Sequence, residues 1–165
     1  MHHRFFLWSE WLLCLSLLCA CSAFGPPDAL EGMSRDEVVA RMGPPDTERR
    51  LDAGSRLEFP RGPYGQQTWF VYFDAAGRAS RVEQILTEKN FSRIEVGMAQ
   101  DEVRQLLGRP SSVQVLGRER GVVWSYRYLS FCNWFQVELT LEQQVRSVGY
   151  GGPPECIKGA DRPDK

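Results

Sequence analysis

The sequence predicts an α+β fold built from two tandem modules, each with short helices packed on a three-stranded antiparallel sheet. The first observation behind this prediction is an internal repeat, because the pattern of residues 32–45 recurs in order at residues 97–110. Each copy holds a Gly-Met pair, an acidic pair, aliphatic residues, and a glycine with proline close behind it. The second observation is that alternating aromatic and β-branched residues follow both copies, a pattern typical of strands.

The repeated segments each predict a short helix. In the first copy Ser34 and Glu37 have the spacing of a capping box, and Gly43 before two prolines ends the helix. In the second copy Ala99 replaces the serine, which should cost this helix start about 1 kcal/mol. We interpret the acidic pairs as favourable charges near the helix N-terminus rather than as catalytic carboxylates. Neighbours on a helix point about 100° apart and do not converge on one substrate atom.

Three strands are expected after each helix. Trp69, Val71 and Phe73 share one face, which should be the core face covered by the helix. Aromatic residues also lie on the opposite face, where a half-exposed sheet is usually polar, and this predicts a second contact surface. The connection at residues 87–92 is too short for a floppy linker, so the modules should pack as one body, and a near-continuous sheet is one way to do so. The expected strands are residues 56–59, 68–73 and 79–86, then 122–128, 134–141 and 145–150.

The N-terminus predicts a secretion signal rather than part of the fold. A helix over the apolar run at residues 11–20 would span about 15 Å, half of the roughly 30 Å hydrocarbon core. Leu18, Ala20 and Cys21 resemble a bacterial lipobox, with Cys21 as the lipidated residue. As in lipoproteins generally, Ser22 then implies an outer-membrane protein that faces the periplasm and is held by its acyl chains. An ordinary cleaved signal with incidental cysteines is the alternative.

The chain therefore divides into a signal peptide (1–20), a linker (21–29), two modules (30–88 and 89–150) and a tail (151–165). Two cysteines remain in the body of the mature chain, Cys132 and Cys156, and an isolated pair in an oxidising compartment predicts a disulfide. Closing a loop of about 25 residues would contribute roughly 3–4 kcal/mol. Two free buried thiols are one alternative. A metal site is another, disfavoured because both histidines lie in the signal.

Composition and motifs argue against catalysis and nucleic-acid binding. The chain has 20 basic and 21 acidic side chains, so no charge excess points to nucleic acid. The mature chain has no histidine, and it shows no nucleophile elbow, phosphate-binding loop or metal-spaced ligand set. We therefore predict a protein that is not an enzyme and that uses no cofactor or metal.

Five residues are candidates for binding a protein partner, because aromatic residues and arginine dominate interface energetics. Two of them lie in the Gly/Pro-rich stretch at residues 58–67, which predicts either a recognition loop or a plain hairpin loop. The aromatic pair on the opposite sheet face is equally consistent with internal packing. The candidates are Arg61, Tyr64, Phe70, Tyr72 and Trp134.

This ordered set of features resembles the SmpA/OmlA family, the BamE-type domain of outer-membrane lipoproteins. The segment at residues 90–98 resembles the start of the domain, and the resemblance covers residues 30–150. It implies a non-catalytic accessory in outer-membrane β-barrel assembly or envelope integrity. Such a protein would bind the assembly machinery's subunits or another envelope protein through its sheet faces and loops. Tandem versions of this topology are similar to β-lactamase inhibitor proteins, in which two modules form a concave sheet that grips an enzyme. A periplasmic inhibitor of a hydrolase is therefore the alternative function.

Overall fold

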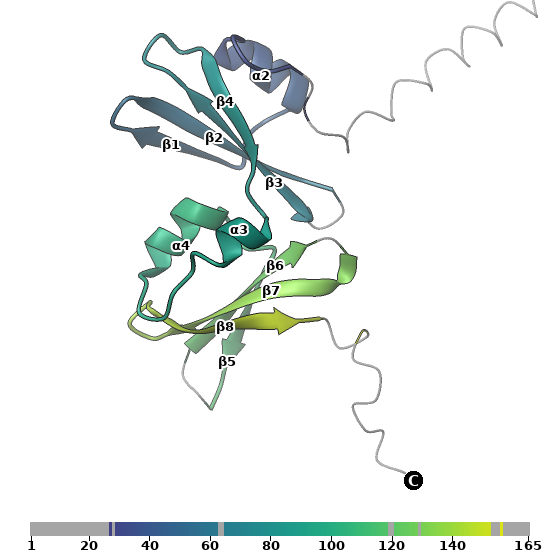
Figure 1. Cartoon of the computed structure of the whole chain (residues 1–165), viewed down its shortest axis with the longest axis vertical. Helices are drawn as coiled ribbons and strands as arrows, with labels where there is room; N and C mark the ends of the chain where they lie inside the picture. Colours follow the sequence, from purple (N-terminus) through teal and green to yellow (C-terminus); the bar gives the residue numbers. More distant parts are fainter. Residues whose placement is uncertain are drawn as a thin grey trace, which may run out of the picture.

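The computed structural model describes residues 27, 29–62, 65–118, 121–128, 130–152 and 156. Within them the strands form two separate four-stranded antiparallel sheets. Helices and sheets alternate as layers, with α2 outside the first sheet and α3 and α4 between the two sheets (Figure 1). The α+β class is confirmed, and the architecture is consistent with two tandem modules.

The first module packs one helix on one face of its sheet. Leu57, Phe59 and Val71 from the sheet are buried against Val38 and Met42 of the helix. Each of these side chains is at most 6% exposed, so the module has a core of its own. Its elements are α2 (Arg35–Met42), β1 (Thr47–Leu51), β2 (Gly54–Arg61), β3 (Gln67–Phe73) and β4 (Ala79–Gln84), with the strands in the order β1-β2-β3-β4.

The second module repeats this order and adds one helical turn before it. Val103 and Leu107 of the longer helix are fully buried against Tyr126, Val137 and Leu139 of the sheet. Its elements are α3 (Glu88–Phe91), α4 (Gln100–Leu107), β5 (Ser112–Leu116), β6 (Gly121–Tyr128), β7 (Ser130–Thr140) and β8 (Val145–Gly151), with the strands in the order β5-β6-β7-β8.

Three details differ from the sequence-based expectation. The segment at residues 87–92, expected only as a connection, forms the short helix α3, whose start is capped by the Thr87 hydroxyl accepting from the Asn90 amide. Each sheet has a fourth strand, β1 or β5, which lies at the edge and pairs with a single neighbour. These strands were missed because they are mostly exposed and so carry no alternation of buried and exposed residues. The sheets also do not join into one near-continuous sheet, because α3 and α4 lie between them (Figure 1).

Both modules fasten the start of their helix to the last hairpin of their sheet in the same way. The backbone amide of Gly32 donates to the carbonyl of Ala79 at 2.7 Å, and Gly97 donates to Val145 at 2.8 Å. Gly32 and Gly97 both have positive φ, +81° and +88°, which glycine adopts without steric cost. The repeated Gly-Met pair therefore serves this backbone connection.

A disulfide joins Cys132 in β7 to Cys156, with 5.5 Å between the two Cα atoms. It connects the chain that follows β8 to the second sheet. The approach is close, because a side chain at Gly152 would begin 2.7 Å from the carbonyl oxygen of Cys132.

Candidate functional site

The face of the first sheet that α2 leaves open is covered by the second module. Arg56 of β2 reaches across the boundary, where its Nη1 donates to the backbone carbonyl of Gln105 in α4 at 2.9 Å. Its Nη2 pairs with Oε1 of Glu58 at 2.5 Å, and both side chains are about 5% exposed. The guanidinium also lies 3.7 Å from the centre of the Phe70 ring. A buried, hydrogen-bonded ion pair therefore connects the two modules.

The C-terminus of α4 makes the closest approach at this junction. Gly108 has φ +70°, and a Cβ there would lie 3.2 Å from both Oε2 of Glu58 and the ring of Phe70. Gly43 at the end of α2 has φ +76° but nothing within 4 Å of the same point. At the rim of the junction, Arg109 pairs with Asp46 at 2.6 Å. Both glycines end their helix, and Gly108 in addition lets the second module approach the first sheet closely.

The junction explains the aromatic residues on the opposite face of β3. Phe70 is 1% exposed and belongs to the core of the second module. Tyr72 is partly buried against the same core, and the guanidinium of Arg81 lies 3.8 Å from its ring centre. The second contact surface predicted from these residues is present, and it is occupied by the chain's own second module. Phe70 is therefore not exposed for an external partner.

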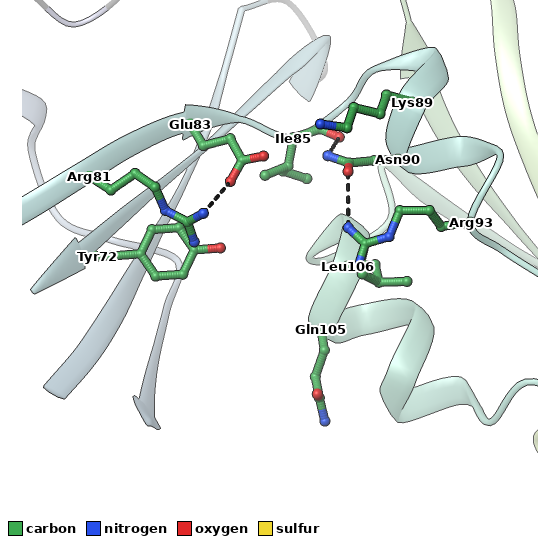
Figure 2. Close-up of a pocket in the computed structure, with 9 residues that line it drawn as sticks. All are labelled: Tyr72, Arg81, Glu83, Ile85, Lys89, Asn90, Arg93, Gln105 and Leu106. Carbon is green, nitrogen blue, oxygen red and sulfur yellow. Dashed lines mark hydrogen bonds and ion pairs between the residues drawn. The ribbon is translucent and has the colours of Figure 1, made fainter. Parts of the chain in front are cut away.

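A polar pocket of about 330 Å³ opens at the edge of the junction (Figure 2). From β4, Arg81 pairs with Glu83 at 3.6 Å. From the α3 region, Arg93 donates to the side-chain carbonyl of Asn90 at 3.2 Å, and Asn90 donates to the backbone carbonyl of Ile85 at 2.9 Å. Glu83 is the one acidic residue in the lining, so the described walls do not offer the paired carboxylates of acid–base chemistry.

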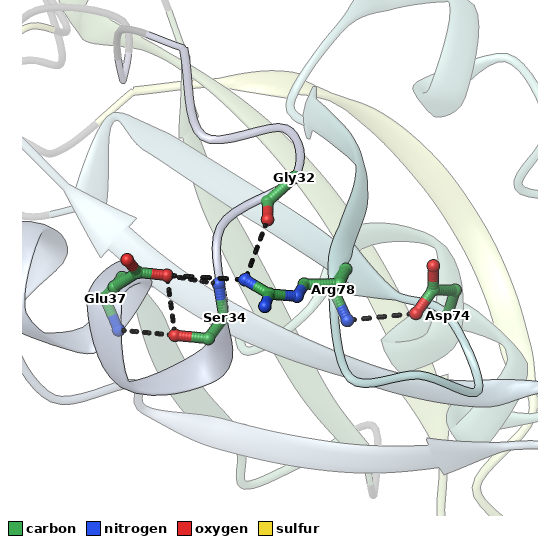
Figure 3. Close-up of polar contacts among 5 residues, drawn as sticks. All are labelled: Gly32, Ser34, Glu37, Asp74 and Arg78. Carbon is green, nitrogen blue, oxygen red and sulfur yellow. Dashed lines mark hydrogen bonds and ion pairs between the residues drawn. The ribbon is translucent and has the colours of Figure 1, made fainter.

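One acidic residue of each repeated helix start is engaged in capping: Glu37 with Ser34 in α2 (Figure 3), and Glu102, which accepts from the Ala99 amide at 2.8 Å in α4. The amide of Ser34 donates to the Glu37 carboxylate at 2.7 Å, and the amide of Glu37 donates back to the Ser34 hydroxyl at 3.4 Å. The Ser34 hydroxyl also donates to the Glu37 carboxylate at 2.7 Å, and this bond together with the bond from the Ser34 amide holds the pKa of Glu37 below its ordinary value. Arg78 lies 3.8 Å from the same carboxylate and donates to the carbonyl of Gly32 at 3.3 Å. At Ala99 the helix start has no side-chain cap, as the sequence predicts.

Two of the other predicted contact residues, Arg61 and Trp134, lie near the boundary between the two modules. Arg61 is half-buried at the end of β2, and Tyr64 in the following loop lies outside the described residues. Trp134 is half-buried on the open face of the second sheet, with the guanidinium of Arg127 4.6 Å from its ring centre. Ser111 lies between the β2–β3 connection and Arg127. Its Oγ accepts from the Arg127 amide at 3.2 Å and lies 3.7 Å from the point where a Gly65 side chain would begin.

The edge strand β5 carries an exposed feature that the sequence-based reasoning missed. Val113 and Val115 are 56% and 75% exposed on the helix-covered side of the sheet. The matching positions of β1 are Glu48 and Arg50, and Glu48 pairs with Arg35 of α2 at 2.7 Å. A comparison of the two copies position by position would have found this difference in the sequence.

Metal ligands and membrane-spanning helices are the remaining features to consider in the described residues. No group of three or more His, Cys, Asp or Glu residues in that part of the chain could hold a metal ion. None of its helices is long and apolar enough to cross a membrane. Cys21, the predicted lipidation site, lies outside the described residues.

Residues 83–144 match the family model of the outer membrane protein assembly factor BamE domain. The comparison with curated proteins gives no match. Among solved structures, a DUF4309 family protein (YjgB) from Bacillus subtilis subsp. subtilis str. 168 is 12% identical with a TM-score of 0.30, over 79% of this chain and 88% of that one. An extracellular protein containing a SCP domain from Bacillus anthracis str. Ames is 10% identical with a TM-score of 0.29, over 74% and 44%. Neither likeness carries an argument about fold or function.

Proposed function

We propose that this protein is a non-catalytic accessory in the assembly of outer-membrane β-barrel proteins, because residues 83–144 match the family model of the BamE domain. It is lipid-anchored at Cys21 in the outer membrane and faces the periplasm, as its lipobox-like segment implies. The domain match is the observation that carries this proposal. In this role the protein acts by binding its partners and holding them together.

We propose further that the chain is a duplicated form of the domain. The first module has the same element order as the second and the same backbone bonds at its helix start. The buried ion pair between Arg56 and Glu58, the bond from Arg56 to Gln105 and the close approach at Gly108 support a scaffold in which the two modules act together. Two modules in contact can hold two partners side by side, which is what a scaffold must do.

The partner surface of this proposal is the place where the β2–β3 connection meets the second module. Arg61 ends β2 there, and across the boundary the guanidinium of Arg127 lies over the ring of Trp134. Arginine and tryptophan are the side chains that most often dominate protein interfaces, because they bury large areas and still donate hydrogen bonds. The partner is an assembly-machinery subunit or another envelope protein.

Co-purification from crosslinked envelopes after mild detergent extraction tests this function. Recovery of barrel-assembly subunits is the expected result. Recovery of a single hydrolase instead would contradict it and favour the inhibitor alternative. The double variant Arg61→Ala/Trp134→Ala should reduce recovery, whereas the control Arg50→Ala/Leu51→Ala on the edge strand of the first module should not.

Membrane fractionation tests the anchor separately. Replacing Cys21 by alanine should release the protein from the outer-membrane fraction into the soluble periplasmic fraction, because the acyl chains provide the membrane affinity. A Cys21→Ala variant that stayed with the membrane would show that the lipoprotein interpretation is wrong.

A further inference from the structure

We propose that the free edge of β5 binds an extended segment of another protein by adding it to the second sheet as a further strand. The segment would have apolar side chains on one face and polar side chains on the other, the pattern of a transmembrane β-strand of an outer-membrane barrel. This inference rests on the proposed function, and it assigns the β5 edge to the substrate of assembly.

The backbone of β5 provides the first part of the site. The strand runs from Ser112 to Leu116 and pairs on one side with β6. Along its other side, alternate residues present N–H and C=O groups that no strand in the described structure uses. Such an edge is a template for strand addition, in which main-chain hydrogen bonds supply the affinity.

The side chains of β5 provide the second part of the site. A comparison of the two modules shows that the fold does not require apolar side chains at this edge. Natural proteins guard edge strands with charges. The first module follows this rule, because Glu48 and Arg50 occupy its edge and Arg35 pairs with Glu48. At the same positions the second module has Val113 and Val115. The same strand order thus has a charged edge in the first module and an uncharged, apolar edge in the second.

The alternation of side chains along β5 favours an added strand that itself alternates apolar and polar side chains. Val115 lies beside Val122 of β6, which packs on the core of the second module. Apolar side chains of an added strand would continue this row, while its polar side chains would lie beside Ser112 and Gln114. The strand carries no charge, so a segment without charges meets no repulsion or desolvation penalty there.

A second copy of the chain is the weaker occupant. Pairing of two β5 strands would join only five residues from each chain. Such a contact lies well below the roughly 1,000 Å² that a stable specific interface needs. Recognition of a peptide strand needs less area, because an extended segment can be captured through its main chain alone.

The test uses the full chain in detergent micelles and two synthetic peptides of about ten residues, a length typical of a transmembrane strand. Both peptides have uncharged side chains and capped ends and carry the same dye of zero net charge. One peptide alternates valine and threonine, and the other has the same composition with its valines grouped. Fluorescence anisotropy should show tighter binding of the alternating peptide. Hydrogen exchange should show new protection of β5 amides. Equal affinities, or protection elsewhere than in β5, would overturn the proposal.

Two variants locate the site. Val115→Lys should weaken binding of the alternating peptide at least tenfold, whereas Val96→Lys should leave it unchanged, although Val96 is equally exposed at 72%. The pair Gln100→Arg/Val113→Glu copies the charged edge of the first module and should also abolish binding. Thermal unfolding midpoints close to that of the unmodified chain would confirm that all three variants are folded.

Two further results would count against the inference. Unchanged peptide affinity in Val115→Lys would overturn it. A concentration-dependent dimer that Val115→Lys dissolves would assign the edge to a second copy and overturn it as well. If peptide binding fails while the assembly subunits still co-purify, the proposed function stands and this inference falls.

Discussion

Replacing Arg56 by methionine should lower the free energy of unfolding by about 3–5 kcal/mol. The side chain is 5% exposed, and its loss would leave the carboxylate of Glu58, 4% exposed, buried without its cation. The variant would also lose the bond to the carbonyl of Gln105 and the contact with the Phe70 ring. Since small domains are stable by about 5–15 kcal/mol in total, this single change would remove a large share of the stability.

Urea unfolding of a chain carrying Cys21→Ala, followed by tryptophan fluorescence, measures this loss. Trp69 reports on the first module and Trp124 on the second, so uncoupled modules would appear as two separate transitions. The double variant Arg56→Met/Glu58→Met should recover most of the stability, because replacing both members of a buried pair by apolar side chains is often neutral or stabilising.

The ion pair of Arg35 and Glu48 is the matched control. Its side chains are 47% and 44% exposed, so Arg35→Met should cost at most about 1 kcal/mol. The reasoning about the junction would be refuted if Arg56→Met cost no more than this control. It would also fail if the double variant were no more stable than Arg56→Met alone.

Four further predictions follow from the same geometry. Gly43→Ala should cost about 1–3 kcal/mol in urea unfolding for its positive φ, and Gly108→Ala should cost more because it also displaces Glu58 and Phe70. Ala99→Ser should raise the unfolding free energy by about 1 kcal/mol by supplying the missing cap, and no gain would contradict this. Cys156→Ser should lower it by roughly 3 kcal/mol, and full stability in reducing agent would argue against the disulfide's role. The lowered pKa of Glu37 gives stability above the unfolded-state pKa that is lost as pH falls through the folded-state value, so Glu37→Gln should flatten the acid side of the stability–pH curve.

The sequence predicted the features that depend on local patterns. The capping box at Ser34, the uncapped start at Ala99 and the glycine helix stops follow from residue types at fixed spacing, and the structure confirms them. The edge strands β1 and β5 could not be predicted in this way. Their residues are mostly exposed, so burial imposes no period on them.

For the candidate contact residues, too, the sequence predicted one part and only the structure showed the other. The sequence showed that Phe70 and Tyr72 lie on the wrong face for a simple half-exposed sheet, and so predicted a contact there. It did not show that the contact is internal, because the sequence does not say which surface meets it. Arg61 and Trp134 were chosen for the same reason, and the structure places Arg127, whose guanidinium lies over the Trp134 ring, one residue (Ser111) away from the β2–β3 connection that follows Arg61.

The sequence by itself thus determined the α+β class, the two modules, the boundaries of the two repeated helices and the likeness to the BamE-type domain. These depend on periodicity and on capping and turn residues, which act within a few positions along the chain. Only the tertiary structure decided that the second module covers the first sheet through Arg56 and Gly108. Likewise, only the tertiary structure showed that β1 and β5 are edges and that β5 is the uncharged one. Burial and strand pairing join residues far apart in sequence, and their free energy depends on which surfaces meet.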